Sequence, residues 1–382
     1  MTMNVFHNYE WKRTGLSPIM NMRFWPSLQL IASVRIARGL LRNFEFNYIF
    51  PDFLFVSGFI SNQYMHETVS SLNLQNIDLE NRTLGVLEAL EREMVRWCSC
   101  HCVFLMDASP DYWNRIQWYS HGIINKLETA RAFIRDENIS IGQRFNLACA
   151  YYLEVDVRTL FENMSSGYRQ YFLTKRYENR SRTFWLDALQ TRTPLNWSQI
   201  CNAVHFDRFS VHDRRNFFHR NFLGLLQLFP KLENLETRFR SIIIFLESEE
   251  LHPFELYLCL CKTEDYQLDN MFNRLSMEQR FSVCKSFLHL PLQGLFLDIL
   301  ERFSKNMPAK FYLELFLFIL FKNFVRNLFD YDYVDLMKNI WASIPNYAKT
   351  EIEQNAIYVH LRQVLDNGRV DFQSLIALNE NV

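Results

Sequence analysis

Glycine is scarce in this chain, with 10 glycines among 382 residues, well below the roughly 7% that is usual in proteins. Few glycines leave few positions where the backbone can adopt a positive φ, so tight β-hairpin turns and the Gly-rich loops that hold phosphates are disfavoured. The formal net charge is −1, so no global field attracts nucleic acid or an anionic membrane. These shortages favour helices joined by short connections.

Long apolar segments and enzyme motifs are also missing. The most apolar run, FYLELFLFIL at 311–320, contains Glu314 and is about ten residues too short to span a membrane, so it predicts a buried helix. The N-terminal MTMNVFHNYEWKRTG lacks the apolar segment of a signal peptide, and we therefore expect a cytoplasmic chain with reduced cysteines. None of the motifs GxGxxG, GxxxxGK[ST], HExxH, GxSxG or CxxC occurs, so the sequence predicts neither an enzyme nor a cofactor.

Apolar residues, by contrast, make up 49% of the chain and recur at helical spacing. Two similar segments, SIGQRFNLACAYYL at 140–153 and SMEQRFSVCKSFLH at 276–289, each begin with a Ser-x-x-Gln capping box ahead of an apolar face. Their separation equals three or four helix pairs of the length common in helical repeats. The sequence therefore predicts an all-α fold, either an irregular α-solenoid or a layered array of antiparallel helix pairs.

The cysteine-rich RWCSCHCVFLMD at 96–107 has two interpretations, half of a zinc site or one face of a helix. At 100° per residue, Cys98 and Cys102 continue an apolar stripe that includes Met94, whereas Cys100 lies on the far side. A tetrahedral zinc site needs further ligands, and no second Cys/His pair with suitable spacing is present. The pattern therefore favours a helix face packed in the core, with no metal.

A basic region at 169–220 contains ten basic and four acidic residues with interleaved aromatic side chains. Such a region can bind RNA through phosphate contacts and base stacking, or it can form solvated helix faces. The candidate nucleic-acid contacts are Arg176, Arg180, Arg182, Arg214, Arg215 and Arg220.

The first 65 residues differ from the rest of the chain. They contain an amphipathic helix at about 26–42 and then an apolar stretch that is interrupted by Pro51. A polar segment at about 65–80 separates them from the remaining residues. We predict an N-terminal helical module at 1–65 and an α-helical array at 80–382.

Within this module, PSLQLIASVRIARGLL resembles the first helix of a SOCS box, the module that docks substrate receptors onto ubiquitin ligases. Leu28, Ala32 and Ile36 match the positions that contact elongin C, and Pro51 matches the proline that contacts a cullin. Ala32 stands where the family usually has cysteine, and Phe53 stands where it has a second proline. The resemblance implies elongin B–elongin C and a cullin as partners. The remainder of the chain resembles α-helical proteins of arthropods, which implies no function.

Three functions remain open at this point. The first is a non-catalytic protein-interaction scaffold, the second a substrate receptor of a cullin-type ubiquitin ligase, and the third an RNA-binding helical array. The apolar spacing of Leu28, Ala32 and Ile36 is also what any packed helix shows. We expect this stripe to pack against the array, which would bury Leu28.

Overall fold

The structure is a computed structural model of the chain. The residues that it describes are 24–43, 62–74, 76–101, 105, 115–175, 180–200, 229–232, 234–247, 252–304, 307–321 and 330–368.

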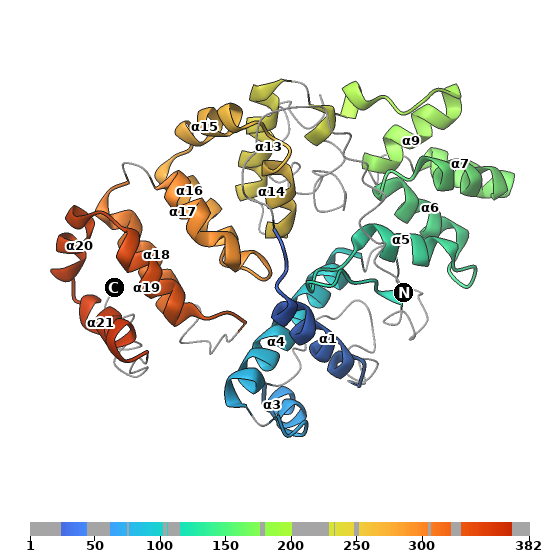
Figure 1. Ribbon diagram of the computed structural model, residues 1–382. Helices are drawn as coiled ribbons and strands as arrows, with labels where there is room; N and C mark the ends of the chain where they lie inside the picture. The colour runs from blue at the N-terminus through green and yellow to red at the C-terminus, as the bar shows by residue number, and fades with distance from the viewer. Residues whose placement is uncertain are drawn as a thin grey trace.

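Every regular element in these ranges is a helix (Figure 1). A single isolated antiparallel bridge, between Trp118 and Ile124, is the nearest feature to a strand within the described segments. The predicted all-α class is confirmed, and the finer arrangement as a solenoid stays a prediction.

The first half of the chain forms α1 (Leu28–Asn43), α3 (Asn62–Ser70), α4 (Ile77–His101), α5 (Lys126–Arg135), α6 (Ile141–Ala150), α7 (Glu154–Asn163), α8 (Ser166–Thr174) and α9 (Arg180–Thr191). The second half forms the 3₁₀ turns η3 (Phe229–Lys231) and η4 (Leu292–Leu295), together with α13 (Leu235–Glu247), α14 (Pro253–Leu260), α15 (Asp265–Asn273), α16 (Met277–Ser286), α17 (Phe296–Phe303), α18 (Ala309–Ile319), α19 (Tyr333–Ser343), α20 (Asn346–Glu353) and α21 (Tyr358–Asn367).

Two helices begin at the serines that the sequence predicts. In α16 the capping box is complete, because Ser276 accepts a hydrogen bond from the Gln279 N–H and the Gln279 side chain accepts one from the Ser276 N–H. In α6 the Ser140 hydroxyl accepts from the Gln143 N–H, and the Gln143 side chain contacts that hydroxyl. Each cap satisfies backbone donors that the first helical turn cannot pair.

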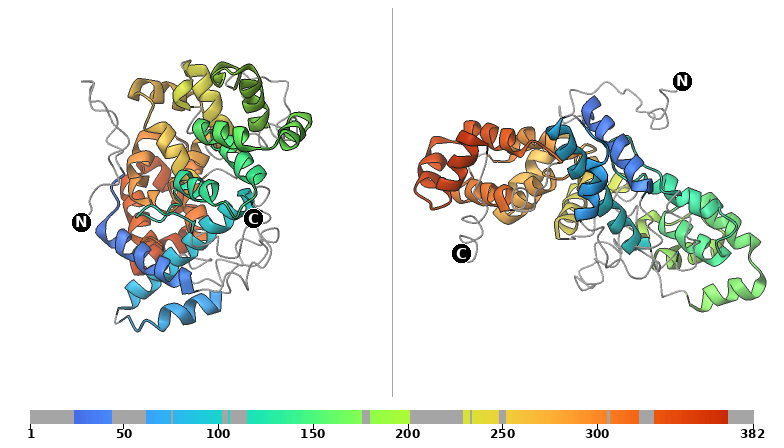
Figure 2. Two further views of the ribbon diagram at one scale, coloured as in Figure 1. Left: turned by 90° about the vertical axis from the view of Figure 1, so that its right-hand side faces the viewer. Right: turned by 90° about the horizontal axis from the view of Figure 1, so that it is seen from below.

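Helix α4 is the centre of the first half of the molecule. From Thr83 to His101 almost all of its described side chains are buried or half-buried, because α1 and α3 pack on it (Figures 1 and 2). The other helices follow an arc across the molecule. Helices α5 to α9 lie toward one end of this arc, and α16 to α21 lie toward the other. The predicted division between 1–65 and 80–382 stays a prediction, although α1 and α4, on either side of it, pack together.

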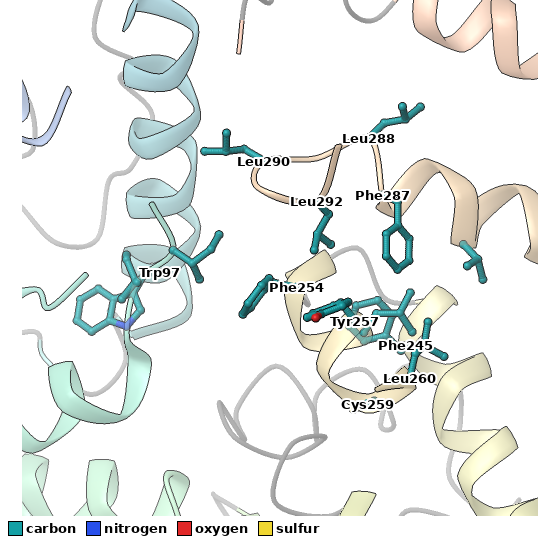
Figure 3. Close-up of a cluster of buried hydrophobic side chains, with 14 of the residues drawn as sticks. Trp97, Phe245, Phe254, Tyr257, Cys259, Leu260, Phe287, Leu288, Leu290 and Leu292 are labelled. Carbon is teal, nitrogen blue, oxygen red and sulfur yellow. The ribbon is translucent and has the colours of Figure 1, made fainter. Parts of the chain in front are cut away.

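The apolar core continues from α4 into the second half of the chain. Figure 3 shows Trp97 of α4 on one side, and Phe254 and Tyr257 of α14 beneath the segment that carries Leu290 and Leu292. All five side chains are buried. Helices that are distant in sequence therefore share one core, which fixes α4 and α14 relative to each other.

Gly122 lies close against side chains of α1 and α4. Its φ is +89°, and a Cβ added there would lie 2.9 Å from Leu90 Cδ2 and 3.1 Å from Val34 Cγ2. Gly122→Ala is expected to lower the free energy of unfolding by about 1–3 kcal/mol, because the backbone conformation is strained for L-residues and α1 and α4 would be forced apart. Urea unfolding measures this loss, and Gly167→Ala, where a Cβ meets nothing within 4 Å, is the control. Equal stability of the two variants would contradict this packing.

Candidate functional site

Helix α1 has one buried face and one exposed face. The apolar residues of its buried face are Leu30, Val34, Ala37, Leu40 and Leu41, and α1 packs on α4. Its exposed face follows a line of residues at alternating spacings of four and three, which we call the outer stripe. The outer stripe consists of Leu28, Ala32, Arg35, Gly39 and Arg42.

The predicted stripe of Leu28, Ala32 and Ile36 lies only partly on this exposed face. The side chain of Leu28 is 85% exposed, Ala32 is exposed and Ile36 is half-buried. Steps of four residues drift by about 40° each around a helix, so Ile36 is carried toward α4. The expectation that Leu28 packs against the array is therefore wrong, and Pro51 lies outside the described residues.

A second large apolar side chain, Trp25, is exposed just before α1 and is 76% accessible. Its neighbour Phe24 holds the start of the helix in place. The Phe24 N–H donates a hydrogen bond of 2.8 Å to the Tyr257 hydroxyl of α14, and the Phe24 ring lies edge-on to His121 and Phe254 at 5.2 and 5.8 Å between centroids. Trp25 and Leu28 therefore lie on a segment that is held in position by the contacts of Phe24.

Arg182, one of the predicted nucleic-acid contacts, is buried in the protein. Arg182 is 5% exposed, its guanidinium donates to the Asn146 side chain and to the Lys175 carbonyl, and it lies 5.1 Å from the centre of the Phe172 ring. The prediction that Arg182 contacts nucleic acid is therefore wrong. Arg180 begins α9, but its side chain is outside the described part, as are all of Arg176, Arg214, Arg215 and Arg220.

The cysteine-rich segment lies at the end of α4. Cys98 is buried in the core and Cys100 is half-buried against it. His101 is buried, and its Nδ1 lies 2.6 Å from the Trp97 carbonyl while its Nε2 lies 2.6 Å from the Tyr151 hydroxyl. Because a carbonyl only accepts, the ring proton is on Nδ1 and Nε2 accepts from Tyr151. The part of α4 that is described thus packs as a core helix, and Cys102 lies outside the described residues.

Neither a metal-binding cluster nor a membrane-spanning helix occurs in the described part of the chain. Across its ranges, no group of three or more His, Cys, Asp or Glu side chains could hold a metal ion. Nor do these ranges contain a helix with the length and apolar character needed to cross a membrane.

Four ionisable side chains meet between α4, α5 and α14, and we call them the charge cluster. They are Glu93, Lys126, His252 and Glu255. The Lys126 ammonium lies 2.7 Å from Glu255 Oε1, and Glu93 Oε2 lies 3.5 Å from His252 Nε2. The Ile124 N–H donates to Glu93 Oε1 at 3.4 Å. The cluster therefore joins segments that are far apart in the sequence.

Burial controls the protonation of Glu93. Loss of solvent raises the pKa of its carboxyl from 4.5 to about 7, even though Lys126 and Arg96 act in the opposite direction. For Lys126, burial favours the neutral form, but the carboxylates of Glu255 and Glu93 outweigh it and raise the pKa above 10.5. Burial and the nearby cations thus act in opposite directions on Glu93, and its raised pKa makes its protonation sensitive to pH near neutrality.

His252 connects the cluster to the start of α14. Its Nδ1 accepts a hydrogen bond of 3.0 Å from the Phe254 N–H, which caps the helix, so the ring proton is on Nε2 and faces Glu93. Burial, with smaller contributions from Arg96 and Lys126, lowers the pKa of His252 well below 6.5. The neutral ring thus caps the helix, and its Nε2 lies close to Glu93 Oε2 without forming a hydrogen bond to it.

A second buried carboxyl group, Glu88, lies one and a half turns earlier on α4. Burial raises its pKa from 4.5 to about 7, with Arg92 opposing the shift and Asp330 adding to it. Asp330 is buried as well, and it accepts hydrogen bonds from the Gln293 side chain at 2.9 Å and the Tyr333 hydroxyl at 3.1 Å. Two carboxyl groups therefore approach each other where α4 meets the start of α19 (Tyr333–Ser343).

Sequence reasoning missed these buried glutamates. A signal was present, because α4 has apolar residues on all sides, with Val86 and Trp97 lying off the stripe of Leu84, Leu87 and Leu90. A helix that is apolar all round is buried all round, so the acidic residues between those positions must be buried as well.

Comparison of the chain with protein-family models, with curated proteins and with solved structures finds no match.

Proposed function

We propose that the protein is a non-catalytic interaction scaffold that binds a partner protein through Trp25 and the outer stripe of α1. The observation that carries this proposal is the 85% exposure of Leu28 beside a 76% exposed Trp25, on a helix whose opposite face is buried against α4. Single exposed apolar residues are ordinary, whereas clustered exposed apolar side chains mark interaction sites, and tryptophan is enriched among the residues that dominate binding energy.

The anchoring of α1 supports the same proposal. Because Phe24 is held by Tyr257, His121 and Phe254, and because α1 packs along α4, a partner need not order this segment when it binds. Binding to a preorganised surface avoids that entropic cost and improves affinity.

Leu28→Asp is the variant that tests this function. Burying a leucine in a partner pocket contributes roughly 1.5–3 kcal/mol, so the variant is expected to lose at least tenfold in affinity while its melting temperature stays unchanged. Val155→Asp on α7 is the matched control, because Val155 is 77% exposed. The measurement is crosslinking and affinity capture with the full chain and both variants. A lowered melting temperature for Leu28→Asp, or identical capture by both variants, would count against the proposal.

A second candidate is a substrate receptor of a cullin-type ubiquitin ligase. It is favoured by Leu28 and Ala32, which match the elongin-contacting positions of a SOCS box and are both exposed on the same side of α1. The same variant tests it with a defined probe. The full chain is expected to bind purified elongin B–elongin C, and Leu28→Asp is expected to abolish this binding. No binding by the unsubstituted chain would exclude this candidate and leave the broader scaffold proposal in place.

A further inference from the structure

The outer stripe changes character along its length. Its first part, Leu28 and Ala32, is apolar and follows the exposed Trp25, and its second part carries Arg35 and Arg42. Helix α1 contains three arginines and no acidic residue. Within the described part of the chain, neither Arg35 nor Arg42 has an ion-pair partner. The second part of the stripe therefore has a positive charge that the surrounding described residues leave unneutralised.

The third arginine, Arg38, adds to this charge from the side. It is half-buried, and burial, with a further contribution from the positive charge of Arg42, lowers the pKa of its guanidinium. Arg38 and Arg42 therefore repel each other. An acidic partner would relieve that repulsion, because a carboxylate between two guanidinium groups is attracted to both.

The spacing and the open space along the stripe fit a helix. Positions 28, 32, 35, 39 and 42 follow the alternating steps of four and three by which helices pack lengthwise against each other. At Gly39 an added Cβ would meet nothing within 4 Å, so the surface is open at the point where a second helix would come closest.

We propose that the outer stripe binds an acidic amphipathic helix of a partner protein, and this inference rests on the proposed docking role of α1. Apolar residues of the partner helix cover Trp25, Leu28 and Ala32. Its carboxylates, one or two turns further on, pair with Arg35 and Arg42.

An anionic membrane is a poorer occupant of the same surface. A helix that lies in a membrane interface has its apolar residues on one side and its basic residues on the other. In α1 the apolar side is already packed on α4, and the exposed apolar and basic residues follow one another along a single line. A flat bilayer would hold both parts of that line at the same depth, although apolar side chains prefer the acyl chains and arginines prefer the headgroups.

The experiment uses the full chain and a labelled synthetic helical peptide, with leucines in its first two turns and glutamates on the same face in its last two turns. Fluorescence anisotropy at low salt is expected to show binding that weakens about tenfold with Arg35→Glu and falls with added salt. Lys338→Glu, which reverses an exposed charge on α19, is expected to bind as the unsubstituted chain does.

Gly39→Leu is the second variant, since it fills the open space without removing any charge. It is expected to weaken peptide binding about tenfold while the melting temperature stays the same or rises, because leucine is the better helix former. Absence of peptide binding, or binding that neither Arg35→Glu nor Gly39→Leu changes, would overturn the inference. Binding of the chain to phosphatidylserine vesicles in place of the peptide would also overturn it.

The two proposals fail in different ways. If Leu28→Asp loses its captured partners while Arg35→Glu and Gly39→Leu keep them, the docking role of α1 stands and the acidic-helix inference is wrong. If Leu28→Asp also keeps them, the docking role itself is wrong.

Discussion

Lys126→Met is expected to lower the free energy of unfolding by about 3–5 kcal/mol at pH 8, the cost typical of removing one partner of a buried ion pair. The ammonium of Lys126 lies 2.7 Å from Glu255, and its charge also acts on Glu93. Its removal takes away the cation that contacts Glu255 and weakens the positive field on Glu93. Urea unfolding monitored by circular dichroism measures the loss.

The loss is expected to depend on pH. The pKa of Glu93 is raised to about 7, so at pH 5.5 Glu93 is already neutral and only Glu255 is left without its partner. The cost of Lys126→Met is therefore smaller at pH 5.5 than at pH 8. The double variant Lys126→Met/Glu255→Gln, which removes both charges of the pair, is the control and should recover part of the stability. An equal cost at both pH values, or no recovery in the double variant, would show that the contact is not electrostatic.

Glu88→Gln is expected to stabilise the protein at high pH. The folded-state pKa of Glu88 is about 7 and the unfolded value is near 4.5, so between these values the folded state binds more protons than the unfolded state. Stability contributed by the protonated carboxyl is therefore present below about pH 4.5 and is lost as the pH rises through 7. Glutamine cannot ionise, so the variant avoids this loss and should be more stable by up to about 3 kcal/mol at pH 8.5.

Denaturant unfolding at pH 5 and pH 8.5 tests this prediction, and the advantage of Glu88→Gln should largely disappear at pH 5. Glu314→Gln on α18 is the control, because Glu314 is half-exposed and its pair with Lys310, at 3.7 Å, is a surface pair. Such pairs contribute little to stability. A Glu88→Gln variant that is less stable than the unsubstituted chain at pH 8.5 would show that the ionised carboxylate is well paired.

The helices were predictable because their signals are local. Apolar spacing and the Ser276–Gln279 box act within one or two turns, so α16 begins where the sequence says it should. The helix predicted at about 26–42 is found as α1 (Leu28–Asn43). Its orientation was not predictable, because apolar residues follow two lines along it, one through Leu28 and one through Val34. Only α4, by packing on the second line, decides which is buried.

The charged residues were harder to predict because their partners are distant. Lys126 and Glu255 are 129 positions apart, and no local pattern reports such a pair. The role predicted for Arg182 was wrong for the same reason. A count of basic residues cannot distinguish an arginine that binds phosphate from one buried against Asn146 and Phe172.

The contact that holds Phe24 has a consequence for the order in which the chain matures. The hydrogen bond to Tyr257 spans 233 positions, so a ribosome releases α1 long before it releases α14. During synthesis α1 can pack on α4 as soon as α4 emerges, but its first turn stays untethered until Tyr257 has left the exit tunnel. A partner that requires the fixed position of Trp25 and Leu28 therefore distinguishes finished molecules from nascent ones.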